Sequence, residues 1–122
     1  MPWLDDKNAL IVDDDKAVND LVRDMLRANG FNVVTCFNGE QALEAAKKSY
    51  FRIIITDYRM PGMRGPDVVR ILRGLFPKAF IIGLSADQKE RDFLDAGADV
   101  FLIKPDHIVK IHSLTAQCEP KK

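Results

Sequence analysis

Six polar side chains in this sequence share one property: each stands at the end of a short apolar run. They are Asp13, Asp14 and Asp15 after residues 9–12, Asp57 after 52–56, Ser85 after 80–84 and Lys104 after 100–103. Crowded carboxylates repel one another, and Mg²⁺ relieves that repulsion through its oxygen ligands. An aspartate carboxylate can attack phosphorus to give an acyl phosphate, while an ammonium and a hydroxyl group stabilise the transferring oxygens. The set is therefore suited to metal-assisted phosphoryl transfer onto an aspartate.

Each of these residues also has a simpler structural interpretation when it is taken alone. The simpler roles are an N-cap for Asp15, a helix-dipole contact for Asp13 and Asp14, a turn for Asp57, a helix cap for Ser85 and an exit turn for Lys104-Pro105. What favours a site is their joint placement at corresponding ends of several strands. The carboxyl ends of parallel strands meet at one edge of a sheet, where ligands bind.

The elements that must position these residues follow from the hydrophobic pattern. Five apolar runs occupy residues 9–12, 31–36, 52–56, 80–84 and 100–103. They are continuous rather than alternating, which is typical of parallel strands buried on both faces. Helical spacing of apolar residues separates the runs and also follows the last one, around residues 18–26, 42–46, 68–75, 93–96 and 108–114. Five alternating strands and helices predict a doubly wound α/β fold with helices on both faces of the sheet.

Composition is ordinary for one globular domain. The chain has 122 residues, 47% hydrophobic and 30% charged, with a formal net charge of zero. This balance gives no general attraction to nucleic acid or membrane surfaces. The apolar runs are too short to span a bilayer, and the acidic start of the sequence is not typical of a signal peptide. Cys36 and Cys118 are expected to be incidental thiols in a reducing cytoplasm.

With these motifs, the sequence resembles the receiver domains of two-component response regulators, the family of the chemotaxis receiver. Four segments carry the resemblance in order: IVDDD at 11–15, IIITDYRMPGMRG at 53–65, IGLSA at 82–86 and AGADVFLIKP at 96–105. The resemblance implies a five-stranded sheet in the flavodoxin-like order 2-1-3-4-5. It also implies a single receiver domain over residues 1–122, with a core at about 8–114 and extensions at 1–7 and 115–122.

The resemblance assigns roles to individual residues. Asp57 matches the phosphoacceptor, and Asp13 and Asp14 match the acidic pair that binds Mg²⁺ together with Asp57. Arg59 matches the position that offers its backbone carbonyl to the same metal. Lys104 matches the lysine that contacts the phosphoryl group, and its bond to the following proline is often cis in the family.

The resemblance also implies residues that switch the conformation and residues that set the lifetime of the acyl phosphate. Ser85 matches the switch hydroxyl and Phe101 the switch aromatic, here without a hydroxyl group. Arg59 and Asp87 match positions at the mouth of the site that influence how long the acyl phosphate lasts. Because their charges are opposite, we predict that they bridge over the phosphoryl group and slow hydrolysis. Two solvated loop charges are the alternative interpretation.

The implied partners are proteins. A histidine kinase or phosphotransfer protein is expected to donate the phosphoryl group, and a downstream protein or output domain is expected to bind the face at 88–116. We expect the polar residues of that face to be Lys89, Arg91, Asp95, Asp99 and Lys110. No direct contact with nucleic acid or membrane is expected, and the expected location is the cytoplasm. The sequence is compatible with a stand-alone receiver and with part of a longer regulator or hybrid kinase.

Two other classes of function remain as alternatives. An aspartyl-phosphate phosphohydrolase would also use D-x-D after the first strand, but it needs a cap for its substrate. A flavodoxin-like cofactor carrier shares the fold, but three aspartates after the first strand would repel a phosphate unless a metal intervened. A receiver, by contrast, promotes its own phosphorylation and dephosphorylation without being a conventional enzyme. Trp3 is expected to be a packing anchor, and His107 and His112 surface imidazoles on the last helix.

Overall fold

The computed structural model describes residues 7–116. Five strands alternate with five helices within this range. In chain order they are β1 (Asn8–Val12), α1 (Lys16–Ala28), β2 (Asn32–Cys36), α2 (Gly39–Ala46), β3 (Ile53–Asp57), α3 (Gly65–Leu75), β4 (Phe80–Ser85), α4 (Glu90–Ala96), β5 (Val100–Ile103) and α5 (Lys110–Ala116). The five predicted strands and their order along the chain are confirmed.

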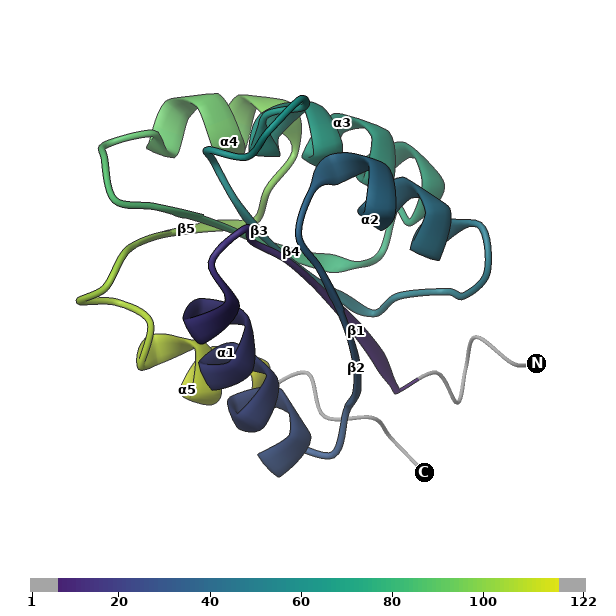
Figure 1. Cartoon of the computed structure of the whole chain (residues 1–122), viewed down its shortest axis with the longest axis vertical. Helices are drawn as coiled ribbons and strands as arrows, with labels where there is room; N and C mark the ends of the chain where they lie inside the picture. The colour runs from purple at the N-terminus through teal and green to yellow at the C-terminus, as the bar shows by residue number, and fades with distance from the viewer. Residues whose placement is uncertain (1–6, 117–122) are drawn as a thin grey trace.

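The strands form one parallel sheet in the order β2-β1-β3-β4-β5, as expected for a flavodoxin-like fold. Helices α1 and α5 cover one face of the sheet, and α2, α3 and α4 cover the other (Figure 1). The sheet is thus the middle of three layers, and β3 is its middle strand. The last residue of β3, Asp57, pairs in register with Leu84 near the end of β4, so the carboxyl ends of these strands meet at one edge.

Two apolar cores, one on each face of the sheet, explain why the strand sequences are continuously hydrophobic. Leu10 and Ile54 point into the core beneath α2, α3 and α4. Their neighbours Ile11 and Ile55 point into the opposite core beneath α1 and α5. Successive side chains of a strand alternate between faces, so a strand covered on both sides needs an apolar residue at every position.

The last helix differs from the prediction at both ends. Residues 104–109 form turns, so α5 begins at Lys110 rather than near residue 108. It continues to Ala116, and Thr115 is fully buried. The Thr115 hydroxyl donates to the carbonyl of Ile111 and accepts from the Asn29 amide at 3.0 Å. The packed domain therefore extends past residue 114, because this polar contact ties α5 to the end of α1.

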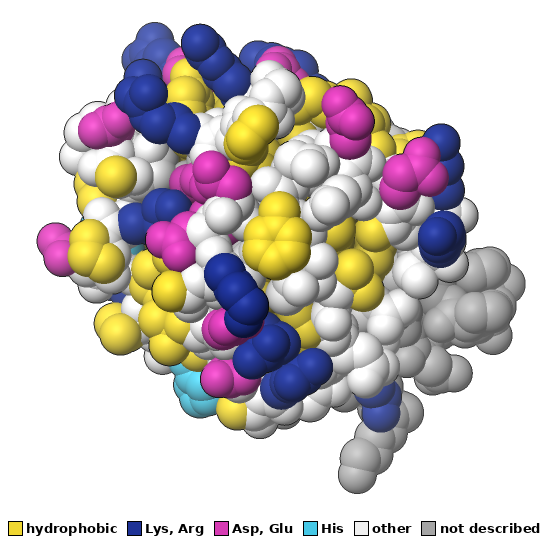
Figure 2. All heavy atoms as spheres, in the orientation of Figure 1, with side chains coloured by type: hydrophobic (Ala, Val, Ile, Leu, Met, Phe, Trp, Pro, Cys, Tyr) yellow, Lys and Arg dark blue, Asp and Glu magenta, His cyan; other side chains and the backbone are white. Residues whose placement is uncertain are grey.

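Charged side chains of both signs are interspersed over the face seen in Figure 2. No helix within residues 7–116 has the length and apolar character needed to cross a membrane. The predictions for Trp3 and Cys118 concern residues outside the described range. Cys36 is buried with a free thiol.

Candidate functional site

Three acids meet where β1 and β3 end. Asp13 is fully buried, Asp57 is 5% exposed, and Asp14 is exposed beside them. Each offers a carboxylate oxygen, and the three oxygens lie within 4.8 Å of one another. The site predicted from the acids at the strand ends is thus assembled by the fold. Three carboxylate oxygens form a hard donor set, which is the kind that Mg²⁺ prefers.

Local hydrogen bonds hold the first of these acids in place. Asp15 is the N-cap of α1, and its carboxylate accepts from the Ala17 N–H at 2.9 Å, as predicted for an aspartate here. The Asp13 carboxylate in turn accepts from the Asp15 N–H at 2.9 Å. Below them, the buried Asn19 amide donates to the carbonyls of Asp13 and Cys36 at 2.8 and 3.2 Å. Asn19 therefore joins the ends of β1 and β2.

Lys104 connects the two buried acids. Its ammonium lies 3.0 Å from Asp13 Oδ2 and 3.0 Å from Asp57 Oδ1, and its side chain is 16% exposed. The Lys104 backbone N–H donates to the Ser85 carbonyl at 2.8 Å, which extends the β4–β5 pairing by one residue. The peptide bond to Pro105 is cis, as the resemblance implied. One cation is thus shared between two carboxylates.

Burial dominates the electrostatics of this cluster. It raises the pKa of Asp13 to about 6, against the opposing hydrogen bond from Asp15 and the charge of Lys104. Burial also raises the pKa of Asp57, although Lys104 and the Tyr58 N–H favour its charged form. For Lys104, burial lowers the pKa, but contacts with Asp57 and Asp13 outweigh it and the net shift is upward. The buried acids are costly to ionise without a further cation.

Ser85 ends β4 at the same edge and is 2% exposed. Its hydroxyl oxygen accepts from the Asp87 N–H at 3.0 Å. The interpretation of Ser85 as a cap of the fourth helix is wrong, because Lys89 stands at the N-cap of α4 and makes no side-chain cap bond. The Arg59 guanidinium and the Asp87 carboxylate form an exposed ion pair at 3.0 Å. The predicted bridge between these side chains is present, and its effect on phosphate lifetime stays a prediction.

An aromatic row links the site loop to β5. Tyr58 follows Asp57 directly, and its ring lies 5.8 Å from that of Phe93 on α4. Phe93 lies 6.0 Å from Phe101, the expected switch aromatic, and is fully buried over Gly83. A Cβ at Gly83 would stand 2.4 Å from the Phe93 ring. Sequence reasoning missed this row, although an isolated glycine inside an apolar run is a signal of close approach.

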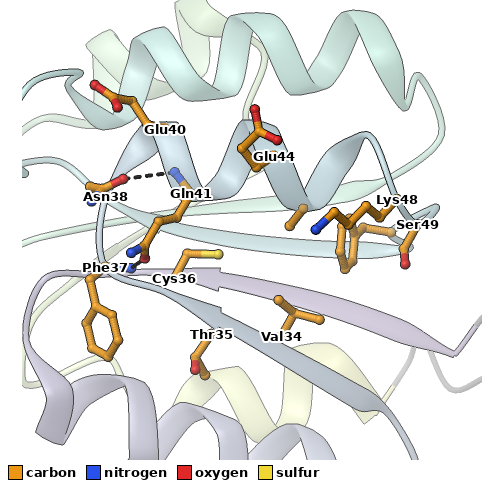
Figure 3. Close-up of a pocket in the computed structure, with 12 residues that line it drawn as sticks. Val34, Thr35, Cys36, Phe37, Asn38, Glu40, Gln41, Glu44, Lys48 and Ser49 are labelled. Atoms are coloured by element: carbon orange, nitrogen blue, oxygen red, sulfur yellow. Dashed lines mark hydrogen bonds between the residues drawn. The ribbon is translucent and has the colours of Figure 1, made fainter.

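Two hollows differ sharply in chemistry. One of about 430 Å³ adjoins the acids and is lined by Asp14, Tyr58, Met60, Pro61 and the cations Arg59, Arg64 and Lys89. A larger groove of about 810 Å³ lies between β2 and α2, and none of the three acids lines it (Figure 3). Cys36 lines that groove, and burial raises the pKa of its thiol to about 11. A thiol with this pKa is a poor nucleophile at neutral pH, which agrees with an incidental cysteine.

Comparison with known proteins supports the same interpretation. The family model of the response regulator receiver domain matches residues 9–116. The cell cycle transcriptional regulator CtrA of Caulobacter vibrioides is 34% identical over 113 residues, which cover 86% of this chain and 48% of the relative. The cell cycle response regulator CtrA of Brucella ovis has the same identity and coverage. The chain thus spans about half the length of the curated relatives it matches.

Solved structures agree with this chain in fold. Chemotaxis response regulator CheY4 of Vibrio cholerae matches with a TM-score of 0.79 and 28% identity over 89% of this chain and 98% of that chain. A Burkholderia pseudomallei response regulator with a phosphorylated aspartic acid, a calcium ion and citrate matches with a TM-score of 0.80 and 28% identity, over 91% of this chain and 66% of that chain. The family model favours a receiver domain over the phosphohydrolase and cofactor-carrier alternatives. With three acids, a lysine and a serine at one edge of a β2-β1-β3-β4-β5 sheet, the chain belongs to the receiver domain family of response regulators.

Proposed function

We propose that Asp57 accepts a phosphoryl group and that Asp13, Asp14 and Lys104 make the transfer possible. The observation that supports this most directly is the position of Lys104, whose ammonium contacts both Asp13 and Asp57 at 3.0 Å. An ammonium held there is placed to neutralise charge on an incoming phosphoryl oxygen. Asp57 is at the end of the central strand, with Asp13 and Asp14 on one side.

The proposed transfer conserves atoms and charge. A carboxylate oxygen of Asp57 forms a bond to phosphorus as the phosphorus–nitrogen bond of a phosphohistidine breaks. The histidine nitrogen keeps the electron pair of that bond and takes a proton from solvent, and the product is an acyl phosphate. Ser85 is placed at the end of β4 to donate its hydroxyl to a phosphoryl oxygen, and Lys104 pairs with another.

A divalent cation, Mg²⁺, is proposed to bind at the acids. The donor set fits, because three carboxylate oxygens within 4.8 Å can all reach one small hard ion. Asp13, Asp14 and Asp57 would hold it, together with the Arg59 backbone carbonyl by family resemblance. When bound, Mg²⁺ neutralises negative charge on the transferring group.

Phosphorylation is proposed to shift a partner-binding face formed by α4, β5 and α5. Ser85 would move towards the phosphoryl oxygen, and Phe101 would fill the space that Ser85 leaves. The proposed donor of the phosphoryl group is a histidine kinase or phosphotransfer protein. The proposed partner of the shifted face is a downstream protein or output domain, which binds residues 88–116. Such a domain acts in the cytoplasm without binding nucleic acid or membrane itself.

The test uses acetyl phosphate as a small donor. Wild-type protein should gain one phosphoryl group by intact mass spectrometry in the presence of Mg²⁺ and none in EDTA. Asp57→Asn should fold and gain none, whereas Asp87→Asn, which changes an exposed acid at the mouth of the site, should still be labelled. Equal labelling of Asp57→Asn would show that another residue is the acceptor.

A further inference from the structure

His107 does not lie on α5, where the sequence placed it. It stands in the turns between β5 and α5 and folds back onto the end of β5. The His107 backbone N–H donates to the Ile103 carbonyl at 2.8 Å. The Ile103 N–H donates to His107 Nδ1 at 3.1 Å. Both backbone hydrogen-bonding groups of Ile103 are therefore taken by one residue.

The geometry of the sheet explains why Ile103 needs this partner. Strand β5 is the last in the sheet order and pairs with β4 on one side only. On the β4 side, the Lys104 N–H donates to the Ser85 carbonyl at 2.8 Å. Backbone groups of neighbouring residues in a strand point to opposite sides, so those of Ile103 point to the open edge. His107 there takes the place of a neighbouring strand.

Lys104 is consequently fixed from two sides. Its own N–H is bound to β4, and the residue before it is bound to His107. Its ammonium must reach Asp13 and Asp57 at the same time, with 3.0 Å to each. Displacement of a catalytic group by about an ångström is enough to slow a reaction substantially. The anchoring of this short segment therefore matters for the position of the ammonium.

We propose that the His107 imidazole is a positioning residue for Lys104, acting as a hydrogen-bond acceptor at the open edge of β5. This rests on the proposed role of Lys104 in phosphorylation of Asp57. Because Nδ1 accepts a hydrogen bond, the proton of the neutral ring is on Nε2. His112 on α5 is the natural comparison, since its exposed side chain is five residues further along the chain.

The test compares three variants. His107→Leu removes the acceptor and keeps an apolar group of similar bulk. His107→Asn retains an acceptor, because its amide oxygen stands one bond beyond Cγ, as Nδ1 does. His112→Leu is the control for loss of an imidazole. For each, we measure the rate of phosphorylation by acetyl phosphate at saturating Mg²⁺, the Mg²⁺ concentration for half the maximal rate, and the Ile103 amide proton shift without donor or metal.

We expect His107→Leu to lower the maximal rate roughly two- to tenfold, the range that corresponds to one lost hydrogen bond. The Mg²⁺ concentration for half the maximal rate should change less than the rate, since the three carboxylates that are proposed to bind Mg²⁺ are all retained. The Ile103 amide proton should move upfield. His107→Asn should restore the rate and the amide shift towards wild type, and His112→Leu should alter neither.

A wild-type rate for His107→Leu with a shifted Ile103 amide would overturn the positioning role and leave the proposed function intact. An equally slow His107→Asn would show that the imidazole acts other than as an acceptor, which also overturns it. Failure of Asp57 as the acceptor would be seen separately, as labelling of Asp57→Asn. If thermal melting shows that His107→Leu does not fold, His107→Ala takes its place in the same comparison.

Discussion

Replacing Asp13 by Asn should stabilise the protein at neutral pH in the absence of metal. Asp13 is fully buried, and its pKa is raised from 3.8 to about 6. The folded state therefore favours the protonated carboxyl more strongly than the unfolded chain does. Above pH 6 the folded protein must hold a buried carboxylate, and folding carries the cost of ionising it. Asparagine has no such cost and keeps an oxygen that can accept from the Asp15 N–H.

The shift sets the magnitude and the pH window. A difference between 3.8 and about 6 corresponds to about 3 kcal/mol at 1.36 kcal/mol for each pKa unit. The folded pKa of this acid is above its unfolded value, so its cost is absent below pH 3.8 and complete above pH 6. About 2 kcal/mol of this ionisation cost should develop between roughly pH 4.5 and 7.5. Over this window the stability of Asp13→Asn should rise relative to wild type by that amount.

Urea unfolding in EDTA at several pH values measures this difference directly. Asp14→Asn is the matched control, because it removes an exposed acid from the same edge of the sheet. Adding Mg²⁺ should then stabilise wild type by mass action, by about 2.7 kcal/mol at a hundredfold excess over Kd, and Asp13→Asn by much less. A stability difference between Asp13→Asn and wild type that is constant with pH would refute the reasoning. Such a result would mean that the contact with Lys104 fully offsets the free-energy cost of ionising the buried Asp13 carboxyl.

Two further predictions concern the mouth of the site and the aromatic row. Arg59→Ala and Asp87→Ala should each speed loss of the phosphoryl group without preventing its uptake. The double variant should lose the group no faster than the single variants, because the same ion pair is lost in every case. Single variants with wild-type dephosphorylation rates would contradict the bridge. Gly83→Ala should destabilise the protein by about 1–3 kcal/mol through overpacking against Phe93. Phe93→Leu should recover part of this loss in the double variant, and additive effects in urea unfolding would argue against the contact.

The sheet and the acidic site could be predicted because both depend on patterns that are local in sequence. Continuous apolar runs mark strands covered on both faces, and the residue after each run lies at a predictable edge. The proximity of Asp13 and Asp57 could be predicted for that reason alone, without knowing where the helices pack. The N-cap role of Asp15 is likewise a property of three neighbouring residues.

The roles of Asn19 and His107 could not be predicted because they depend on contacts across the fold. Asn19 looks like any polar residue of an amphipathic helix, yet it is buried and bonded to the ends of two strands. His107 falls in an apolar spacing that also suits a helix, but the chain forms turns there and its ring returns to β5. The burial of Thr115 similarly depends on Asn29, which is 86 residues away.

The contacts of α4 show how the site and the expected output face are joined. Strand β4 carries Ser85 at the site and Gly83, two residues earlier on the same face, where Phe93 of α4 is seated. Tyr58 follows Asp57, packs against Phe93 and donates its hydroxyl to Asp92 on α4 at 3.1 Å. Closely packed interiors transmit displacements rather than absorb them. Because Phe93 packs over Gly83 and against Tyr58, we predict that phosphorylation changes the position of α4 rather than the fold of the sheet.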